Sequence, residues 1–268
     1  LFGQFAWHVT DRLTIQPGVR INYDKKTGLY DRKVFDGLGN PVLLGQTGAV
    51  KAAQLAIFSP QSYQPSGSDW NFSYDLTLSY KIAPDVLVYG TYAKTFKSFG
   101  INQNGVPNDA SGAPALAAQT ILPESLRHYE AGIKAQFLDR RATLNLSAFR
   151  TDIDNYQAQV TNGQFGTVRG YLANAEKVRT QGFEADFSLR PSERFNLYIN
   201  GAYTDATYRK FADAPCPPEL SGGGTGAVIG AVGAPGTNSP AFCDISGQQL
   251  PGVSKWSLSY GAEYNVPA

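Results

Sequence analysis

The sequence lacks any run of about 18 consecutive apolar residues, which is the length that a membrane-crossing helix needs. Its 268 residues are 42% hydrophobic, but these residues are dispersed along the chain, and the mean hydropathy is −0.26. A transmembrane helix is therefore excluded. A transmembrane β-barrel is not excluded, because its lipid-facing residues occupy every second position and its mean hydropathy resembles that of a soluble protein.

A surplus of one charge sign is also missing. The 23 basic residues balance 22 acidic residues, for a formal net charge of +1. Nucleic-acid-binding proteins normally carry a basic surplus, so we expect no nucleic-acid partner. The chain begins with LFGQFAWHVT, which has no initiator methionine, basic segment or apolar leader. We therefore expect an internal portion of a longer protein.

Cysteine and histidine are scarce, with two residues of each. Cys216 and Cys243 flank one Gly/Pro-rich segment, which predicts a disulfide outside the cytoplasm. Closing such a loop contributes about 3.6 kcal/mol in the chain-entropy model. His8 and His128 lie far apart and show neither metal-ligand spacing nor a neighbouring nucleophile motif. We therefore expect no catalytic site, no metal and no cofactor.

What the chain does contain is repeated two-residue alternation of apolar and polar residues. In the segment 129–137 the apolar residues occupy every second position, and the same pattern follows a polar turn at 139–141. This period places successive side chains on opposite faces of a strand, and the short turn makes the pair antiparallel. The segment is therefore predicted to be a hairpin with one apolar and one polar face.

About nine strands follow this pattern, and the lengths of their connections alternate. Short turns are predicted near residues 10, 84, 140 and 192, and long loops near 45 (residues 25–68), 110, 165 and 230. This alternation is typical of transmembrane barrels, with short periplasmic turns and long extracellular loops. Pro17 is an exception inside a predicted strand, because proline lacks a ladder donor. A short helix within 49–58 is a further expectation.

Aromatic spacing agrees with the thickness of a membrane. Trp70 and Tyr80 lie ten residues apart on one face, which is about 33 Å along a strand. A tilt of about 40° reduces this to about 25 Å, the height of the apolar band of a barrel. Trp256 and Tyr264 give a similar, slightly shorter span. These four residues are predicted to be membrane-girdle aromatics.

Five ordered blocks carry a family resemblance: YAKTFKSFG, PESLRHYEAGIKAQFLDRRATLNLSAFRTDIDNYQ, NAEKVRTQGFEADF, LYINGAYTDATY and LPGVSKWSLSYGAEY. Together they resemble the C-terminal barrel of TonB-dependent outer-membrane receptors. The resemblance implies an all-β, antiparallel transmembrane β-barrel that an N-terminal plug domain fills; such transporters have about 22 strands. Residues 1–268 are then part of a single outer-membrane β-barrel domain, and the plug and remaining strands lie outside this chain.

The resemblance also implies a function. It predicts a receptor in the outer membrane of a Gram-negative bacterium that imports a scarce, bulky nutrient, namely a ferric siderophore, another metal chelate or an oligosaccharide. The TonB complex would act through the plug, and the bilayer and lipopolysaccharide would surround the barrel. Position and hydrogen-bonding capacity select five candidate ligand contacts: Asn102, Gln103, Asn104, Tyr156 and Gln157.

Two other functions remain open from the sequence. A passive porin would share the strand pattern without a plug, whereas a secreted β-rich adhesin would bury its apolar faces in a soluble core. The charged residues on the polar faces are interpreted as a solvated inner wall with cross-strand ion pairs, which would also hold a plug. They are Arg20, Asp24, Asp75, Lys81, Glu130, Lys134, Glu184, Asp186, Arg190 and Glu263.

Overall fold

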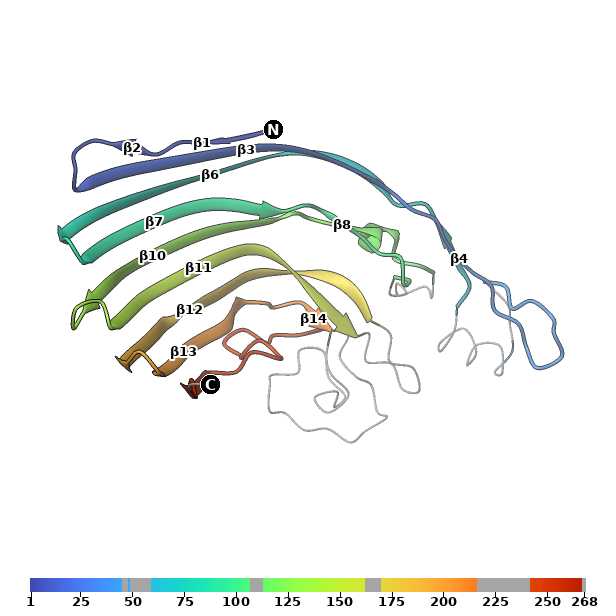
Figure 1. Ribbon diagram of the computed structural model, residues 1–268. Helices are drawn as coiled ribbons and strands as arrows, with labels where there is room; N and C mark the ends of the chain where they lie inside the picture. The colour runs from blue at the N-terminus through green and yellow to red at the C-terminus, as the bar shows by residue number, and fades with distance from the viewer. Residues whose placement is uncertain (45–47, 49–58, 107–112, 162–169, 216–241, 267–268) are drawn as a thin grey trace.

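The computed structural model describes residues 1–44, 48, 59–106, 113–161, 170–215 and 242–266. Most of these residues form one curved antiparallel sheet (Figure 1), in the order β1-β3-β6-β7-β10-β11-β12-β13-β16. Its strands are β1 (Phe2–Gln4), β2 (Trp7–His8), β3 (Leu13–Thr27), β6 (Ser66–Ala83), β7 (Val86–Lys97), β10 (Glu124–Phe137), β11 (Ala142–Thr161), β12 (Gly170–Ser192), β13 (Phe195–Lys210) and β16 (Trp256–Tyr264). β1 and β16 are its edges, and the sheet does not close on itself.

The nine strands in this order agree with the number predicted from the alternation of apolar and polar residues. The predicted all-β, antiparallel barrel architecture is also confirmed. β1 and β2 belong to one interrupted strand, because both pair with β3 in the same register. The interruption lies opposite Pro17. Phe5 N donates to Pro17 O at 3.3 Å, but Pro17 has no N–H to return a bond. A proline in the middle of β3 is tolerated because this side of β3 faces an edge strand.

The connections alternate in length as predicted. Short turns lie at the left end of the sheet in Figure 1, and long connections lie at the right. The long connections carry their own short elements: β4 (Tyr30–Arg32) with β5 (Gln61–Tyr63), β8 (Gly100–Ile101) with β9 (Thr120–Ile121), β14 (Ala214–Pro215) with β15 (Phe242–Cys243), and the 3-10 helix η1 (Leu116–Gln119). The helix expected within 49–58 lies outside the described residues.

The first long connection is shorter than predicted. The sequence predicts a loop over residues 25–68, whereas β3 extends to Thr27 and β6 begins at Ser66. The ends of these strands carry Lys, Ser and Gly on both faces, so alternation disappears although the backbone pairing continues as far as Thr27 and Ser66. Polar residues on both faces are expected where a strand extends beyond the apolar band into water.

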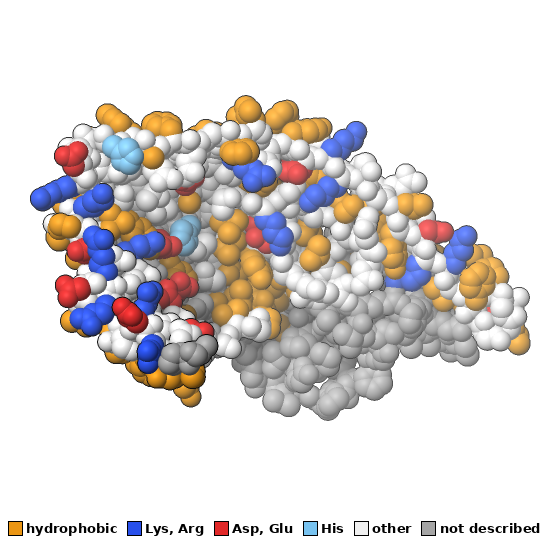
Figure 2. Space-filling view, viewed as in Figure 1, with side chains coloured by type: hydrophobic (Ala, Val, Ile, Leu, Met, Phe, Trp, Pro, Cys, Tyr) orange, Lys and Arg blue, Asp and Glu red, His pale blue; other side chains and the backbone are white. Residues whose placement is uncertain are grey.

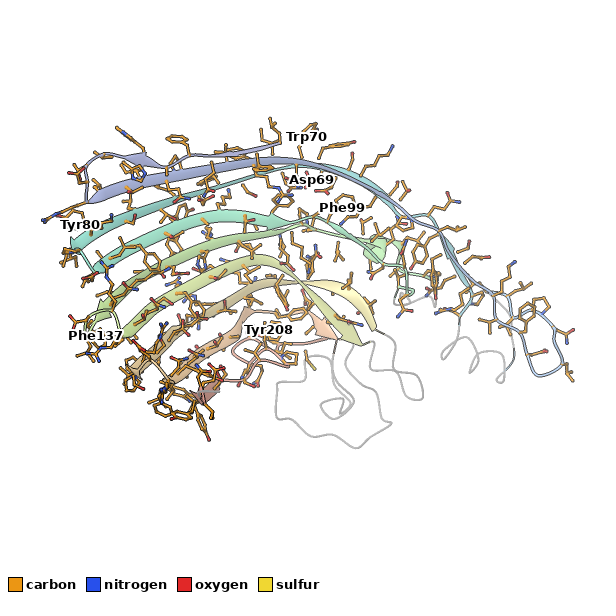
Figure 3. All side chains as sticks on the ribbon, viewed as in Figure 1. Asp69, Trp70, Tyr80, Phe99, Phe137 and Tyr208 are labelled. Atoms are coloured by element: carbon orange, nitrogen blue, oxygen red, sulfur yellow. The ribbon has the colours of Figure 1, made fainter. Side chains whose placement is uncertain are left out.

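The register places apolar residues in rows across neighbouring strands. One row runs through Leu78, Gly90, Ala131, Ala148 and Phe183. We call this side of the sheet the apolar face and the other side the polar face. Adjacent residues such as Asp69 and Trp70 (Figure 3) therefore belong to opposite faces.

Large side chains of the apolar face are exposed. The exposed fraction is 70% for Trp70, 46% for Leu78, 68% for Trp256 and 77% for Tyr260. Figure 2 shows further hydrophobic side chains along the upper rim, where β1, β3 and β6 lie. No second layer covers this face within the described residues, so it lacks the core that a soluble β-rich adhesin requires. The same residues include no helix long and apolar enough to cross a membrane.

A small apolar cluster does form near the long connections. It contains Ile153 of β11, Val178 of β12 and Tyr208 of β13, together with Phe211 and Leu250. The segment 245–250 runs along β13 before the start of β16, where Leu250 N donates to Ala206 O and Tyr208 N donates to Gln248 O, both at 2.9 Å. The long connection between β13 and β16 is therefore anchored to the sheet.

The β10–β11 turn adopts an uncommon backbone conformation. Leu138, Asp139 and Arg140 have φ angles of 54°, 53° and 63°, although L-residues pay about 1–2 kcal/mol in this left-handed region. β-Branched residues are especially unfavourable there. We therefore expect Asp139→Ile to lower the free energy of unfolding by about 1–2 kcal/mol, measured from urea midpoints in lipid vesicles.

The next turn at the same end provides a matched control for this substitution. Glu193 is also an acidic turn residue, and it is not among the positive-φ residues of the described chain. Glu193→Ile therefore removes the same charge without requiring a left-handed β-branched residue. Equal effects of the two substitutions would show that the left-handed backbone of the β10–β11 turn is not their cause.

Candidate functional site

The long connections are tied to one another by side-chain amides that bind two backbone groups at once. Gln61 Nε2 donates to Val106 O at 2.7 Å, and Val106 N donates back to Gln61 Oε1 at 3.1 Å. Two residues of neighbouring antiparallel strands exchange a pair of hydrogen bonds in the same way. Here the side-chain amide of Gln61 takes the place of one backbone peptide group. It joins the β4–β5 connection to the connection that follows β7.

Asn102 makes a second amide pairing of this kind, with β12. Asn102 Nδ2 donates to Leu172 O at 2.9 Å, and Leu172 N donates to Asn102 Oδ1 at 2.7 Å. The same amide group donates to Ala118 O at 2.7 Å, and Tyr63 Oη donates to the Asn102 carbonyl at 3.0 Å. Asn102 is only 2% exposed, so it joins three segments from inside the wall.

A third amide completes the set. Leu122 N donates to Asn174 Oδ1 at 2.8 Å, and Asn174 Nδ2 donates to Leu122 O at 3.1 Å and to Asn155 O at 2.8 Å. We call the three amide pairings the clasps. They unite the β4–β5 connection, residues 98–122 and the β11–β12 ends into one unit, which we call the vestibule wall.

A buried carboxylate closes the base of the vestibule wall. Glu124, at the start of β10, is 5% exposed, and its Oε1 lies 3.0 Å from Lys97 Nζ at the end of β7. Gln157 N also donates to Glu124 Oε1 at 2.8 Å. The Gln157 side chain donates to Ser98 O and Leu122 O at 2.9 and 3.1 Å. The ion pair and the amide hold both ends of the 98–122 connection.

The five predicted ligand contacts divide into two groups. Asn102 and Gln157 are buried, and their amides hold the wall; Tyr156 packs near Tyr208, with ring centroids 6.5 Å apart. Gln103 and Asn104 are exposed, and Asn104 Nδ2 donates to Gly170 O at 3.0 Å. Of the five predicted ligand contacts, all except Tyr156 therefore belong to the vestibule wall. Gln103 and Asn104 are the two whose exposed side chains could contact a ligand.

Several residues of this wall were not predicted from the sequence. Gln61 and Asn174 lie in polar segments where no motif distinguishes a structural amide from a solvated one. Arg32 was also missed; its Nε donates to Ser59 O at 2.8 Å, and its Nη1 donates to Tyr30 Oη at 3.4 Å. Within the described residues, no carboxylate lies within salt-bridge distance of this guanidinium. It is a candidate contact for an anionic group.

Tyr63 keeps its proton at physiological pH. Burial, followed by the charge of neighbouring Tyr30, raises the pKa of the Tyr63 hydroxyl to about 12. Because this pKa is raised, protonated Tyr63 contributes to the stability of the folded state below about pH 10, the ordinary pKa of tyrosine. This contribution is lost as the pH rises toward 12. The hydrogen bond to Asn102 therefore persists throughout the physiological range.

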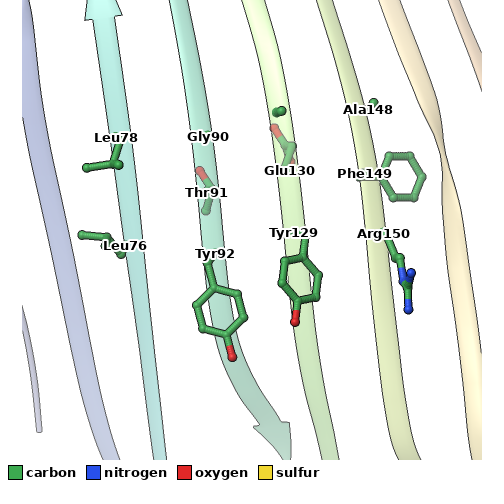
Figure 4. Close-up of a pocket in the computed structure, with 11 residues that line it drawn as sticks. Leu76, Leu78, Gly90, Thr91, Tyr92, Tyr129, Glu130, Ala148, Phe149 and Arg150 are labelled. Atoms are coloured by element: carbon green, nitrogen blue, oxygen red, sulfur yellow. The ribbon is translucent and has the colours of Figure 1, made fainter.

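The apolar face has a hollow bordered by charged residues (Figure 4). Its volume is about 560 Å³, and its lining includes Leu78, Gly90 and Ala148, with Tyr129 and Arg150 at one end. Beyond Arg150, the register aligns Lys94, Arg127, Asp152 and Arg179 across β7, β10, β11 and β12. We call these four residues and Arg150 the basic row. The alternation of apolar and polar residues in the sequence did not predict this basic row.

The predicted girdle aromatics all lie exposed on the apolar face. Trp70 packs against Tyr23 with ring centroids 4.9 Å apart, and Trp256 packs against Tyr203 at 4.8 Å. Tyr264 lies 6.5 Å from Phe195, and Tyr80 is 44% exposed. These positions are compatible with contact with lipid headgroups, and the girdle role itself stays a prediction.

The remaining scarce residues occupy ordinary structural positions. His8 bonds Thr14 at 2.9 Å, and His128 lies between Thr151 and Glu130 at 2.8 and 3.3 Å. The described residues include no cluster of three or more potential metal ligands. Cys243 is buried in β15 beside Ala214, whereas Cys216 lies outside the described residues. The Cys216–Cys243 disulfide therefore stays a prediction.

The sheet, its alternating connections and its exposed apolar face define an outer-membrane β-barrel class. All 268 residues match the family described as TonB dependent receptor-like, beta-barrel. The chain belongs to this family of TonB-dependent receptors, which are transport proteins and not enzymes. Its outer-membrane localisation follows from family membership.

Named relatives include a metal-pseudopaline receptor and a pesticin receptor. The chain is 31% identical over 131 residues to the metal-pseudopaline receptor CntO of Pseudomonas aeruginosa, covering 49% of this chain and 16% of CntO. It is 26% identical over 200 residues to the pesticin receptor of Yersinia pestis, covering 75% of this chain and 24% of that receptor. The chain thus spans less than a quarter of either relative.

Solved structures give the same fold. The ferric yersiniabactin uptake receptor FyuA from Yersinia pestis superposes with a TM-score of 0.64 at 20% identity, covering all of this chain and 31% of FyuA. The siderophore receptor PiuA from Acinetobacter baumannii superposes with a TM-score of 0.59 at 19% identity, covering 99% of this chain and 30% of PiuA. At these identities the superpositions establish the fold alone.

Proposed function

We propose that this chain is one part of a TonB-dependent receptor that imports a metal chelate, with a ferric siderophore as the preferred class. The family match over the whole chain carries this proposal. The vestibule wall adds support, because its hydrogen-bonded frame preorganises the exposed amides of Gln103 and Asn104 and also carries the cationic guanidinium of Arg32. An oligosaccharide would also bind amides, but Arg32 favours an anionic chelate.

The proposed mechanism assigns separate tasks to the two ends of the barrel. The vestibule wall would capture the chelate outside, with exposed Gln103 and Asn104 as direct contacts. A plug domain, proposed to precede this chain, would then shift when the TonB complex delivers energy, and the lumen would open. The solvated polar face, including Glu130 and Glu184, would hold the plug before that step.

The first experiment is the intact mass and N-terminal sequence of the protein extracted from native outer membranes. A chain much longer than 28.9 kDa, with a plug-sized domain before Leu1, is the expected result. A mature protein beginning near Leu1 would contradict the plug and the TonB mechanism. It would leave a passive porin, which liposome-swelling rates with small sugars would then reveal.

Ligand contact predicts a specific effect of Gln103→Ala combined with Asn104→Ala. We expect this pair to weaken binding of a ferric chelate by about 10-fold, because two polar contacts of about 0.5–1.5 kcal/mol each are lost. The full-length receptor would be titrated with ferric yersiniabactin and metal-pseudopaline, the chelates printed in the names of one similar structure and one relative.

Lys33→Ala combined with Asn40→Ala is a suitable control for the ligand-contact pair. Both are exposed positions in the first long connection. Equal affinity of the wild type and the Gln103/Asn104 variant for every bound chelate would exclude these residues as contacts. Failure of the wild type to bind or import any metal chelate would instead contradict the proposed substrate class.

A further inference from the structure

The candidate ligand contacts Gln103 and Asn104 lie on a segment that a different connection of the chain holds in place. We propose that Tyr63 and Gly28 position these two amides for the ligand. Both residues act through the segment that carries the amides and do not contact the ligand themselves. This inference rests on the proposed function, and it assigns the arrangement of the binding surface to residues outside that surface.

Tyr63 and Gly28 belong to an arm that extends past the rest of the sheet (Figure 1). The arm consists of residues 26–32 and 59–67, which include the ends of β3 and β6 and the whole of β4 and β5. Gly28 N donates to Pro65 O at 2.9 Å, and β4 pairs with β5 beyond this point. Backbone pairing therefore continues past the end of β3, and the arm is a paired ribbon.

The segment 99–106 begins its course along the arm at Phe99. Lys26 and Gly67 lie opposite each other on the arm. Lys26 Nζ lies 5.1 Å from the centroid of the Phe99 ring, and a Cβ atom added to Gly67 would meet that ring at 2.8 Å. The aromatic ring thus rests directly on the arm, which fixes the start of the segment.

Tyr63 holds the middle of the segment at two points. Its hydroxyl donates to Asn102 O at 3.0 Å, and the Gly105 N–H donates to the same hydroxyl oxygen. These two backbone groups flank Gln103 and Asn104, so one side chain fixes both ends of the stretch that carries the amides. Tyr63 is only 6% exposed, and water therefore does not compete for these contacts.

Gly105 allows the segment to lie close against the arm. Its φ angle is 95°, in the left-handed region that favours glycine. A Cβ atom at this position would lie 3.2 Å from Gln61 Oε1, 3.3 Å from Tyr30 Oη and 3.4 Å from Arg32 Nη1. The close approach thus places the Arg32 guanidinium beside the residue that follows Asn104.

Gly28 leaves room for the side chain of Gln103. A Cβ atom added to Gly28 would lie 2.6 Å from Gln103 Nε2 and 3.1 Å from Ile101 Cδ1, so the amide lies directly on the glycine backbone. Within the described residues the Gln103 carboxamide makes no hydrogen bond. Its two N–H donors and its carbonyl oxygen stay available to a ligand, while the contact with Gly28 limits where they can lie. Such preorganisation favours binding.

Gly28→Ala tests this contact with one added methyl group. The methyl group must displace the Gln103 amide, which is the end of a flexible side chain, so folding is retained. We expect the affinity of the full-length receptor for ferric yersiniabactin or metal-pseudopaline to fall about threefold, the share of one of two polar contacts. Gly37→Ala adds the same group where nothing lies within 4 Å, and its affinity should equal that of the wild type.

A double-mutant cycle separates positioning from a general effect on the wall. If Gly28 acts through Gln103, Gly28→Ala weakens binding in the wild type but changes it by less than about 1.5-fold in the Gln103→Ala background. A purely structural effect would be the same in both backgrounds. Equal losses in the two backgrounds would overturn the role of Gly28.

Tyr63→Phe removes only the hydroxyl that holds the segment. Because both amides lose their support, we expect chelate binding to weaken by about tenfold, as for loss of both contacts. Hydrogen exchange at the Gly105 amide of the ligand-free receptor should accelerate by about tenfold or more, since this N–H loses its acceptor. Tyr23→Phe, at an exposed position of the apolar face, is the control and should change neither quantity.

The two measurements distinguish failure of this inference from failure of the proposed function. Failure of the wild type to bind any metal chelate would contradict the proposed function. Faster exchange at Gly105 in Tyr63→Phe would then still support positioning by Tyr63, and unchanged exchange would overturn it. In a receptor that does bind chelate, wild-type affinity of Tyr63→Phe would equally overturn the role of Tyr63. Heat-modified migration on gels would verify folding of each variant.

Discussion

Leu76→Arg is expected to destabilise the inserted barrel by about 2–4 kcal/mol, which is the cost of a cation at the bilayer midplane on a lipid-facing strand. Leu76 lies on the apolar face of β6, midway between Trp70 and Ile82, and is 40% exposed. We therefore expect lipid to surround this side chain in the inserted barrel. The free energy would come from reversible urea unfolding in phospholipid vesicles.

Ser79→Arg is the matched control for this prediction. Ser79 lies three residues along the same strand but on the polar face, across from Thr14 and Tyr89. Arginine there would reach the aqueous lumen, and we expect a change within about 0.5 kcal/mol, as for other surface substitutions. If Leu76→Arg were as harmless as Ser79→Arg, the assignment of the apolar face to lipid would be wrong.

Asn102→Leu is expected to open the vestibule wall. The substitution keeps the approximate volume but leaves the partly buried N–H and C=O of Leu172 and the carbonyl of Ala118 without their amide partner. Each unsatisfied buried group costs about 1–3 kcal/mol, so the local opening free energy should fall by about 3–5 kcal/mol. The readout is hydrogen exchange at the Leu172 amide, which should accelerate by at least a hundredfold.

Asn104→Leu tests whether this effect is specific to the clasp. Asn104 is exposed and makes one hydrogen bond, to Gly170 O, so its loss should leave exchange at Leu172 within a few-fold of the wild type. Gln61→Leu should behave like Asn102→Leu, with the effect at the Val106 amide. Unchanged exchange at Leu172 in Asn102→Leu would show that the wall does not depend on this amide.

Alternation made the sheet predictable because a barrel strand meets lipid on one side and water on the other. This two-sided environment imposes a period of two on residues such as Leu76 and Ser79, and the rows follow once the turns are located. The same logic fails above the membrane. At Lys25 and Ser68 both faces meet water, so β3 and β6 continue without any alternation to indicate it.

The candidate site was only partly predictable for a different reason. An amide in a polar segment has the same composition whether it contacts ligand, backbone or water. Asn102 and Gln103 are neighbours in sequence, but the first is buried in a clasp and the second is exposed. Asn102 is the one that turns inward because its amide pairs with Leu172, seventy positions away. The sequence around Asn102 does not reveal so distant a partner.

The clasps also have a consequence for the order of folding. The hairpins β6–β7, β10–β11 and β12–β13 have short turns, so their contacts close short loops. The clasps instead join residues 45, 70 and 52 positions apart in sequence. Because long-range contacts become favourable only after the chain between them is ordered, the vestibule wall should assemble after the hairpins that carry it. A newly inserted barrel would thus span the membrane before it can recognise its ligand.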